Sequence, residues 1–304
     1  MSKLSKFIKS PLLLFVFLSN RGINLFNDKT YLKIRYYATF KKFLNLTNPQ
    51  TFNEKLQWLK LNDRKDIYTK MVDKYEAKSY VSKIIGNKYI IPTLGIYNNF
   101  DEIDFNKLPN QFVIKCTHDS GGLVIVKDKS KLDIKRAKKK INKSLKRNYY
   151  YLGREWPYKN VKPRIIVEKY MHDELTNDLR DYKFFCFNGN CKFFKIDFNR
   201  SINHQANYFD IKGEILPFGE QVCLPDFSKL LDLPVNLQKM LKLSEKLSKN
   251  IPFLRVDFYE IKGDVYFGEL TFYPSSGFGK FEPEEWDLKL GNLIDLSLVN
   301  KNEK

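Results

Sequence analysis

Residues 253–273 read FLRVDFYEIKGDVYFGELTFY, and this stretch says most about the fold. Two runs rich in aromatic and β-branched residues flank Lys262-Gly263-Asp264. Such runs around a short turn that contains glycine predict a β-hairpin, with strands over 253–261 and 265–273.

The polar residues of this hairpin suggest a cation site. Side chains alternate between the two faces of a strand, so Arg255 and Asp257 share one face. A three-residue loop would place Asp257 opposite Glu269, whereas a two-residue turn at Lys262-Gly263 would put the two acids on opposite faces. Opposed carboxylates repel each other unless a cation lies between them, and Mg²⁺ is commonly held by one or two carboxylates together with substrate phosphates. Two solvated acids on an exposed sheet face are the alternative.

A second candidate site lies upstream, where two apolar runs surround a glycine-containing loop. The runs are 112–115 (FVIK) and 123–126 (LVIV), and the loop between them contains Asp119-Ser120-Gly121-Gly122. Glycine lets the backbone approach a ligand closely, and loop amides beside Lys115 suit phosphate oxygens. An ordinary hairpin with a glycine turn explains the same residues equally well.

The remaining periodicity predicts an α+β fold with mostly antiparallel sheets. Helices are expected from Thr51, which has capping-box spacing to Glu54, and over 69–85, within 127–147 and over 234–250. Further strands are expected over 164–171, 182–187 and 191–198. We expect three parts, namely a helical N-terminal region (1–90), a small lobe with the glycine hairpin and a basic helix (91–170), and a large lobe with the metal-binding hairpin (171–304).

Composition points to a folded and strongly basic protein. Of 304 residues 43% are hydrophobic and 15% aromatic, which excludes a disordered chain. The 53 Lys and Arg outnumber 35 Asp and Glu, giving a formal net charge of +18. Eleven basic and only two acidic residues lie in 127–147, where an apolar stripe at helical spacing predicts an amphipathic helix. This basic stretch is either a solvated face or a docking surface for a polyanion or membrane headgroups.

Several common sites are missing from the sequence. Neither a P-loop nor a Rossmann glycine fingerprint is present, and no D-x-D motif occurs. The longest apolar run, 12–18, is too short to span a membrane, and we expect it to form a packed N-terminal helix or a weakly interfacial one. Four scattered cysteines indicate reduced thiols, so we expect a cytoplasmic protein that can also contact the inner membrane surface.

The order of these motifs resembles the ATP-grasp fold and, more narrowly, the TupA-like ATP-grasp family, named for teichuronopeptide synthesis. The resemblance covers roughly residues 48–286. Seven stretches carry it in order: 48–58 (NPQTFNEKLQW), 73–74 (DK), 113–122 (VIKCTHDSGG), 181–189 (DYKFFCFNG), 255–259 (RVDFY), 267–274 (FGELTFYP) and 282–286 (EPEEW). Each stretch alone is weak, but seven in order are specific.

The resemblance implies an ATP- and Mg²⁺-dependent carboxylate–amine ligase that works through an acyl phosphate. Asp257 and Glu269 would hold Mg²⁺, and Arg255 would stabilise the transferring phosphoryl group. Many ATP-grasp enzymes have Glu-x-Asn where this chain has Glu269-Leu270-Thr271, so residue 271 is dropped as a ligand. The implied nucleotide contacts are Lys115 and Lys183 to phosphates, Ser120, Gly121 and Gly122 as the phosphate loop, Glu168, Lys169, Tyr170 and Met171 as the adenine hinge, and Glu174 at the ribose.

For this family the implied setting is the assembly of bacterial capsule or cell-wall polysaccharide. The expected partners are an acidic sugar or polysaccharide precursor, which the +18 charge would attract, and an amino acid or peptide. No nucleic acid is expected as a partner. A glycosyltransferase of the same pathway is the first alternative, and the missing D-x-D argues against it. A nucleic-acid binder is the second, and the paired acids of the hairpin argue against a phosphate-backbone groove.

Overall fold

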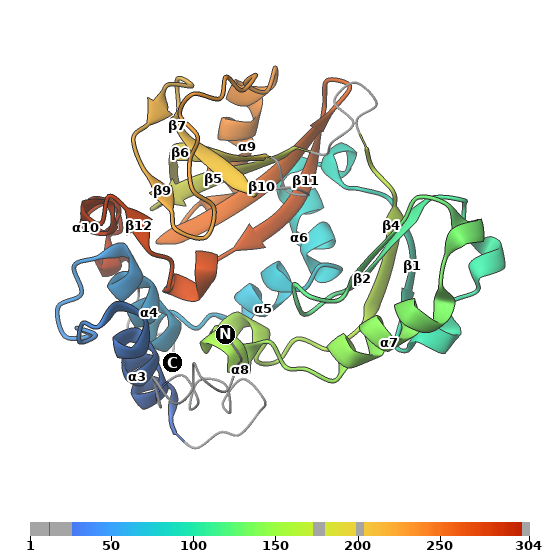
Figure 1. The fold of residues 1–304 in the computed structure, drawn as a ribbon, viewed down its shortest axis with the longest axis horizontal. Coiled ribbons are helices and arrows are strands. Elements are labelled where there is room, and N and C mark those ends of the chain that lie inside the picture. The colour runs from blue at the N-terminus through green and yellow to red at the C-terminus, as the bar shows by residue number, and fades with distance from the viewer. Residues whose placement is uncertain (1–11, 13–25, 173–179, 199–203, 300–304) are drawn as a thin grey trace.

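The computed structural model describes residues 12, 26–172, 180–198 and 204–299. Its described residues form two large antiparallel β-sheets and a small two-stranded one, with helices between and beside the large sheets (Figure 1). The predicted α+β class with antiparallel sheets is therefore confirmed. The helix expected near residues 12–18 lies outside the described residues, apart from Leu12.

The N-terminal part of the described chain is helical. Its helices are α3 (Asp28–Phe40), α4 (Phe52–Asn62), α5 (Asp66–Val72) and α6 (Glu76–Ile85). Thr51 caps α4 through the predicted capping box, in which the Thr51 side chain accepts from the Glu54 N–H and the Glu54 carboxylate accepts from the Thr51 N–H.

The single helix predicted over 69–85 is wrong, because the chain breaks between α5 and α6. The Asp73 carboxylate accepts hydrogen bonds from the backbone N–H groups of Tyr75 (2.8 Å) and Glu76 (3.3 Å). An aspartate that bonds to the next N–H groups along the chain starts a new helix instead of continuing the old one. The apolar period spans both helices, which is why the sequence hides the break.

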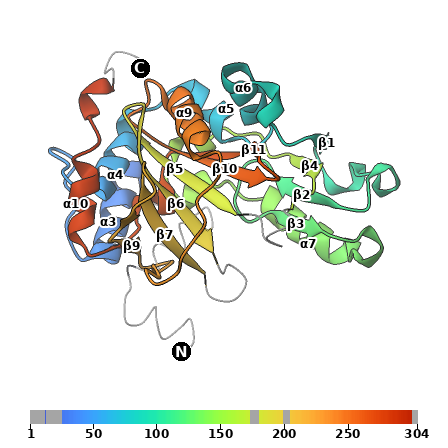
Figure 2. The same cartoon turned by 90° about the horizontal axis from the view of Figure 1, so that it is seen from above.

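The smaller sheet has four strands in the order β1-β4-β2-β3. They are β1 (Thr93–Tyr97), β2 (Phe112–Cys116), β3 (Leu123–Val126) and β4 (Ile165–Lys169). Helix α7 (Ile134–Leu145) covers one face of this sheet, where Ala137 and Ile141 join Phe112 and Ile114 in one buried cluster. Figure 2 shows α7 beside β2 and β3. Ala137 and Ile141 of the apolar stripe thus pack inward, whereas Ile134 at the start of α7 is 48% exposed and most lysines of the basic stretch lie at the surface.

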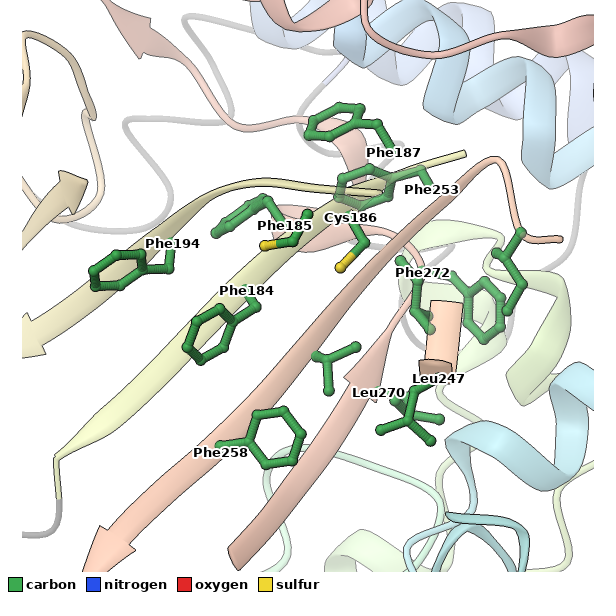
Figure 3. Packing of buried hydrophobic residues seen from close by; sticks show 14 of the residues in the cluster. Phe184, Phe185, Cys186, Phe187, Phe194, Leu247, Phe253, Phe258, Leu270 and Phe272 are labelled. Atoms are coloured by element: carbon green, nitrogen blue, oxygen red, sulfur yellow. The ribbon is translucent and has the colours of Figure 1, made fainter. Parts of the chain in front are cut away.

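The larger sheet has six strands in the order β11-β10-β5-β6-β7-β8. They are β5 (Asp181–Phe187), β6 (Asn190–Phe198), β7 (Gln205–Asp210), β8 (Ile215–Leu216), β10 (Phe253–Ile261) and β11 (Asp264–Thr271). Helix α9 (Leu237–Ser248) packs on one face, and Figure 3 shows part of the aromatic-rich core of this lobe. Alternation leaves the polar residues of these strands on the opposite face.

The hairpin of β10 and β11 contains a β-bulge that the sequence did not predict. Strand pairing runs to Ile261 opposite Asp264, so the turn has only the two residues Lys262 and Gly263. Asp257 nevertheless lies opposite Glu269, because the pairing shifts by one residue between Asp257 and Phe258. Gly268 is the extra residue of this β-bulge, and a Cβ there would lie 3.0 Å from the Asp257 carbonyl oxygen. Glycine therefore suits the bulge that brings the two acids together.

Shorter elements complete the fold. They are α8 (Tyr150–Gly153), α10 (Glu285–Gly291), the strand pair β9 (Gly219–Glu220) and β12 (Phe281–Glu282), and 3₁₀ turns at Asn87–Tyr89, Phe100–Glu102, Phe105–Lys107, Lys129–Lys131, Trp156–Tyr158, Pro274–Gly277 and Leu296–Leu298. Within the part of the chain that the structure describes, no helix is long and apolar enough to cross a membrane. All four cysteines are buried and unpaired, as predicted.

Candidate nucleotide and metal site

A pocket joins residues of both sheets. Lys115 and Glu168 line it from the smaller sheet, while Gly268 and Glu269 line it from the β10–β11 hairpin of the larger sheet. Its remaining wall comes from α5, α6, the segment after α6 and neighbouring loops, with apolar residues such as Met71, Val72, Ala77, Ile90 and Ile91. An apolar wall next to charged groups suits a flat base attached to phosphates.

Glu168 ties two lysines together in this pocket. Its carboxylate accepts from Lys115 Nζ at 2.6 Å and forms a second ion pair with Lys78 of α6. Burial alone would raise the pKa of the Glu168 carboxyl, but Lys115 and Lys78 more than offset it and lower this pKa below its usual value. Glu168 is therefore ionised and holds Lys115 at the pocket wall.

This ion-pair cluster gives a pH-dependent prediction. A lowered folded-state pKa adds stability that is present above the unfolded pKa of about 4.3 and is lost as pH falls through the folded pKa. Glu168→Gln should lower the free energy of unfolding by about 3 kcal/mol at pH 7, because it leaves two lysines without their carboxylate. In urea titrations, this difference from the unmodified protein should stay constant down to about pH 5 and shrink below it. A difference that grows on acidification would contradict the assignment.

The predicted adenine hinge begins at Glu168, near the end of β4. The Lys169 N–H already donates to the Pro92 carbonyl oxygen at 3.0 Å. Tyr170 and Met171 leave the strand, and the Tyr170 ring stacks on His172 with centroids 5.3 Å apart. Glu174, expected at the ribose, lies outside the described residues. The adenine contacts of this segment stay a prediction.

The glycine loop is held from within by Asp119. The Asp119 carboxylate accepts from the N–H groups of Gly121 (3.2 Å) and Gly122 (3.0 Å) and pairs with the Ser144 hydroxyl. Ser120 is exposed, and its hydroxyl lies 3.4 Å from the Tyr149 hydroxyl. Binding of phosphate to these two amides would require them to leave Asp119.

Lys74 links this loop to the pocket. Its Nζ donates to the Asp119 carbonyl oxygen at 2.6 Å, and Lys74 also lines the pocket. Sequence reasoning assigned Lys74 no role, although its position directly after the helix-breaking Asp73 is a usable signal.

Arg255 bonds to both acids of the β10–β11 hairpin, Asp257 and Glu269. Its Nε and Nη2 donate to the two carboxylate oxygens of Asp257, each at 2.7 Å, and Nη2 also donates to Glu269 at 3.0 Å. Asp257 is only 1% exposed, whereas the Glu269 side chain is 47% exposed. Burial raises the pKa of the Asp257 carboxyl to about 6 while Arg255 and Lys183 oppose the rise, so Asp257 is ionised at neutral pH.

The same pair fits a magnesium ion by the chemistry of its donors. Two carboxylates face each other with a guanidinium between them, so the pair is built around positive charge. Among the described residues, no group of three or more His, Cys, Asp or Glu side chains could hold a metal by itself. The pair therefore suits a Mg²⁺ ion whose other oxygen ligands come from phosphates and water. For the ion to bind, Arg255 would have to release at least one of the carboxylate oxygens that it now contacts.

Lys183 begins a buried polar network on the same face of the larger sheet. It lies opposite Asp257 on the neighbouring strand, and its Nζ pairs with Asp181 at 2.6 Å and with Asp197. Asp197 in turn accepts from His204, 2.9 Å away. The predicted phosphate contact of Lys183 would thus be made from a lysine already held by two acids.

Sequence reasoning missed the continuation of this network. Lys195 lies opposite Lys183 on β6, and Lys195 Nζ is 3.9 Å from Glu220. Glu220 accepts from the hydroxyls of Tyr208 (2.6 Å) and Ser275 (2.8 Å). Alternation along β6 could have revealed Lys195 and Asp197 as inward-facing charges, but nothing local marks Glu220.

Comparison with known proteins agrees with this architecture. A family model described as TupA-like ATPgrasp matches residues 54–295. The chain belongs to the TupA-like ATP-grasp family. The chain is therefore an ATP-grasp protein, and ATP and Mg²⁺ are the standard cofactors of this fold.

Solved structures similar to this chain include two D-alanine–D-alanine ligases. The Helicobacter pylori enzyme is 16% identical, with 82% of this chain and 70% of that chain covered and a TM-score of 0.44. The Bacillus anthracis enzyme complexed with ATP is 16% identical, with 66% of this chain and 53% of that chain covered and a TM-score of 0.39. D-alanyl-alanine synthetase A from Vibrio cholerae is 10% identical, with 81% and 65% covered and a TM-score of 0.45.

The chain thus spans about half the length of the Bacillus anthracis enzyme. A search of curated protein sequences found no match.

Proposed function

We propose that this protein uses ATP to join a carboxylate to an amine as an amide. The observation that carries the proposal is the shared pocket, which Lys115 and Glu168 line from one sheet and Glu269 lines from the other. A cationic wall opposite an acidic hairpin is the arrangement that a metal-bound polyphosphate requires.

The reaction balances without a reactive nucleophile from the protein. A carboxylate oxygen of the acid attacks the γ-phosphorus of ATP, the bond from that phosphorus to the β–γ bridging oxygen breaks, and ADP leaves. The amine nitrogen then attacks the acyl carbon of the acyl phosphate, loses a proton, and phosphate leaves. Positioning and charge stabilisation supply most of the rate in chemistry of this kind.

The residues divide this work between the two sheets. Lys115 and Lys183 would bind phosphate oxygens, and Ser120, Gly121 and Gly122 would cover them. Mg²⁺, held by Asp257 and Glu269, would neutralise phosphate charge. Arg255 would stabilise the phosphoryl group in transfer by exchanging one of its carboxylate contacts for a phosphate oxygen, since its guanidinium is already bonded to both acids.

The proposed acid is a uronic acid of a capsule or cell-wall polysaccharide or of its precursor, and the proposed amine is an amino acid or peptide. The net charge of +18 supports an acidic substrate, because a strongly basic protein attracts polyanions. The family resemblance supports polysaccharide assembly in the cytoplasm, at or near the inner membrane surface.

Trapping of the acyl phosphate tests the reaction directly. The protein is incubated with MgATP, a panel of uronic acids and hydroxylamine, which converts an acyl phosphate into a coloured hydroxamate. We expect hydroxamate and ADP only when an acid is supplied, and ADP release with an amino acid in place of hydroxylamine.

Lys115→Ala should weaken MgATP binding at least tenfold. The control Lys83→Ala, which changes an exposed lysine of α6, should leave MgATP binding unchanged. MgATP binding that is unchanged in Lys115→Ala would contradict the site.

A further inference from the structure

Strand β3 forms an open edge of the smaller sheet. Among the described residues it pairs only with β2, and it borders a groove of about 770 Å³ between this edge and α7. The Cys116 N–H donates to the Gly122 carbonyl oxygen, which sets the alternation of the β2–β3 ladder. By that alternation the backbone N–H and C=O of Ile125 point away from β2, towards the open edge.

The groove combines an apolar floor with a basic rim. Leu123, Ile125 and Leu132 contribute aliphatic surface, and Ile125 is 53% exposed. Lys127, Lys131, Arg136 and Lys140 also line the groove. Of these four, Lys127, Arg136 and Lys140 form no ion pair with any residue in the described ranges.

The two acids of the groove are already engaged by the backbone. Asp128 accepts from the Ser130 N–H at 3.0 Å, and Asp133 caps α7 by accepting from the Arg136 N–H at 2.9 Å. The side of α7 that faces away from the sheet adds further lysines. The charge at this edge is therefore available to an acidic ligand.

An acidic peptide fits this edge better than other polyanions. An open strand edge offers N–H and C=O groups at the spacing of another peptide backbone, which neither a sugar chain nor a lipid surface can match. No aromatic ring lines the groove among the described residues, so nucleic-acid bases would find no stacking platform. A lipid surface would require protruding apolar side chains, whereas this surface is concave.

The edge also leads towards the candidate active site. Strand β3 begins directly after Gly122 of the glycine loop, and Leu123 lies opposite Lys115. A chain extended along β3 would thus run beside the loop that we propose to cover the phosphates.

We infer that the open edge of β3, with the basic side chains at the start of α7, binds an extended acidic peptide as an additional strand. The inference rests on the proposed ligase only for its purpose, namely to hold a peptide substrate beside the phosphate loop. Peptide binding is measured without ATP, so the two proposals can fail separately.

Fluorescence anisotropy tests the inference with a labelled peptide of four Glu-Val repeats and the full-length protein. Arg136→Glu combined with Lys140→Glu should weaken binding at least tenfold. Lys242→Glu combined with Lys246→Glu, the same charge change at the same spacing on α9, should change it less than twofold. A peptide N-methylated along one edge, which cannot donate to a strand, should also bind at least tenfold more weakly than the unmodified peptide.

Three results would overturn the inference. The first is equal binding of the N-methylated and unmodified peptides, which would leave charge alone as the cause. The second is an equal loss in the α7 and α9 variants. The third is a protein that does not bind the peptide but binds an oligouronic acid or phosphatidylglycerol vesicles, with that binding weakened by the α7 substitutions. MgATP binding is measured in parallel. Loss of MgATP binding with intact peptide binding would count against the ligase site alone, and the reverse result would count against the peptide site alone.

Discussion

Asp257→Asn should abolish ATP turnover, with a loss of about 10³-fold or more in kcat, while the protein stays folded. The amide keeps the shape of the side chain but removes the negative charge that Arg255 contacts and that the proposed Mg²⁺ would need. A thousandfold loss corresponds to about 4 kcal/mol of transition-state stabilisation. Steady-state ADP release at saturating MgATP measures the effect, and circular dichroism measures the fold.

Asp264→Asn is the matched control. Asp264 is the exposed first residue of β11 in the same hairpin, so its variant makes the same chemical change away from the two acids. Its turnover should stay within twofold of the unmodified protein. Full activity in Asp257→Asn would remove Asp257 from the metal site.

Lys60→Met should lower the free energy of unfolding by about 3–5 kcal/mol. Lys60 is fully buried, and its Nζ donates to the Gln57 side chain (2.8 Å) and to the carbonyl oxygens of Gly153 (2.7 Å) and Ser276 (2.7 Å). Burial lowers the pKa of this lysine well below its usual value, although Glu155 partly opposes the shift. Methionine keeps the apolar stem but removes the Nζ donor from the Gly153 carbonyl oxygen and from the Gln57 side-chain oxygen, both of which are buried.

Urea unfolding of Lys60→Met and Lys33→Met tests this expectation. Lys33 is an exposed lysine of α3, and its substitution should stay within about 0.5 kcal/mol of the unmodified protein. Equal stability of the two variants would show that the three contacts of Lys60 contribute nothing net. The loss is expected to be large because Lys60 joins α4, α8 and the turn after β11.

The strands that the sequence predicted lie close to their predicted positions, but β1, β7, β8, β9 and β12 were not predicted. Strands β3 and β10 have the predicted bounds, and the other predicted strands differ by one or two residues at their ends. Clear alternation bounded by Gly, Asn or Asp explains this success. The predicted helix over 69–85 failed because a capping aspartate in mid-pattern does not change the apolar period.

The site was predictable where the chemistry is local. Asp257 and Glu269 face each other as predicted, and Lys115 and Glu168 share one pocket with Glu269. The role of Glu168 as the partner of Lys78 was not predictable, because the two residues are far apart in the sequence. Glu220 was missed for the same reason, since only the fold brings it to Lys195. The nucleotide contacts and the three-part division of the chain stay predictions.

The bulge at Gly268 also limits which changes of length this hairpin can accept. In a hairpin closed by a two-residue turn, facing residues are separated by an odd number of positions, as Ile261 and Asp264 are. Asp257 and Glu269 are an even number of positions apart, so one surplus residue is needed somewhere between them. A relative with a turn one residue longer and no bulge would keep the acids facing each other. At the same spacing, a longer turn that kept the bulge, or a two-residue turn without it, would shift the pairing by one residue and put the two acids on opposite faces.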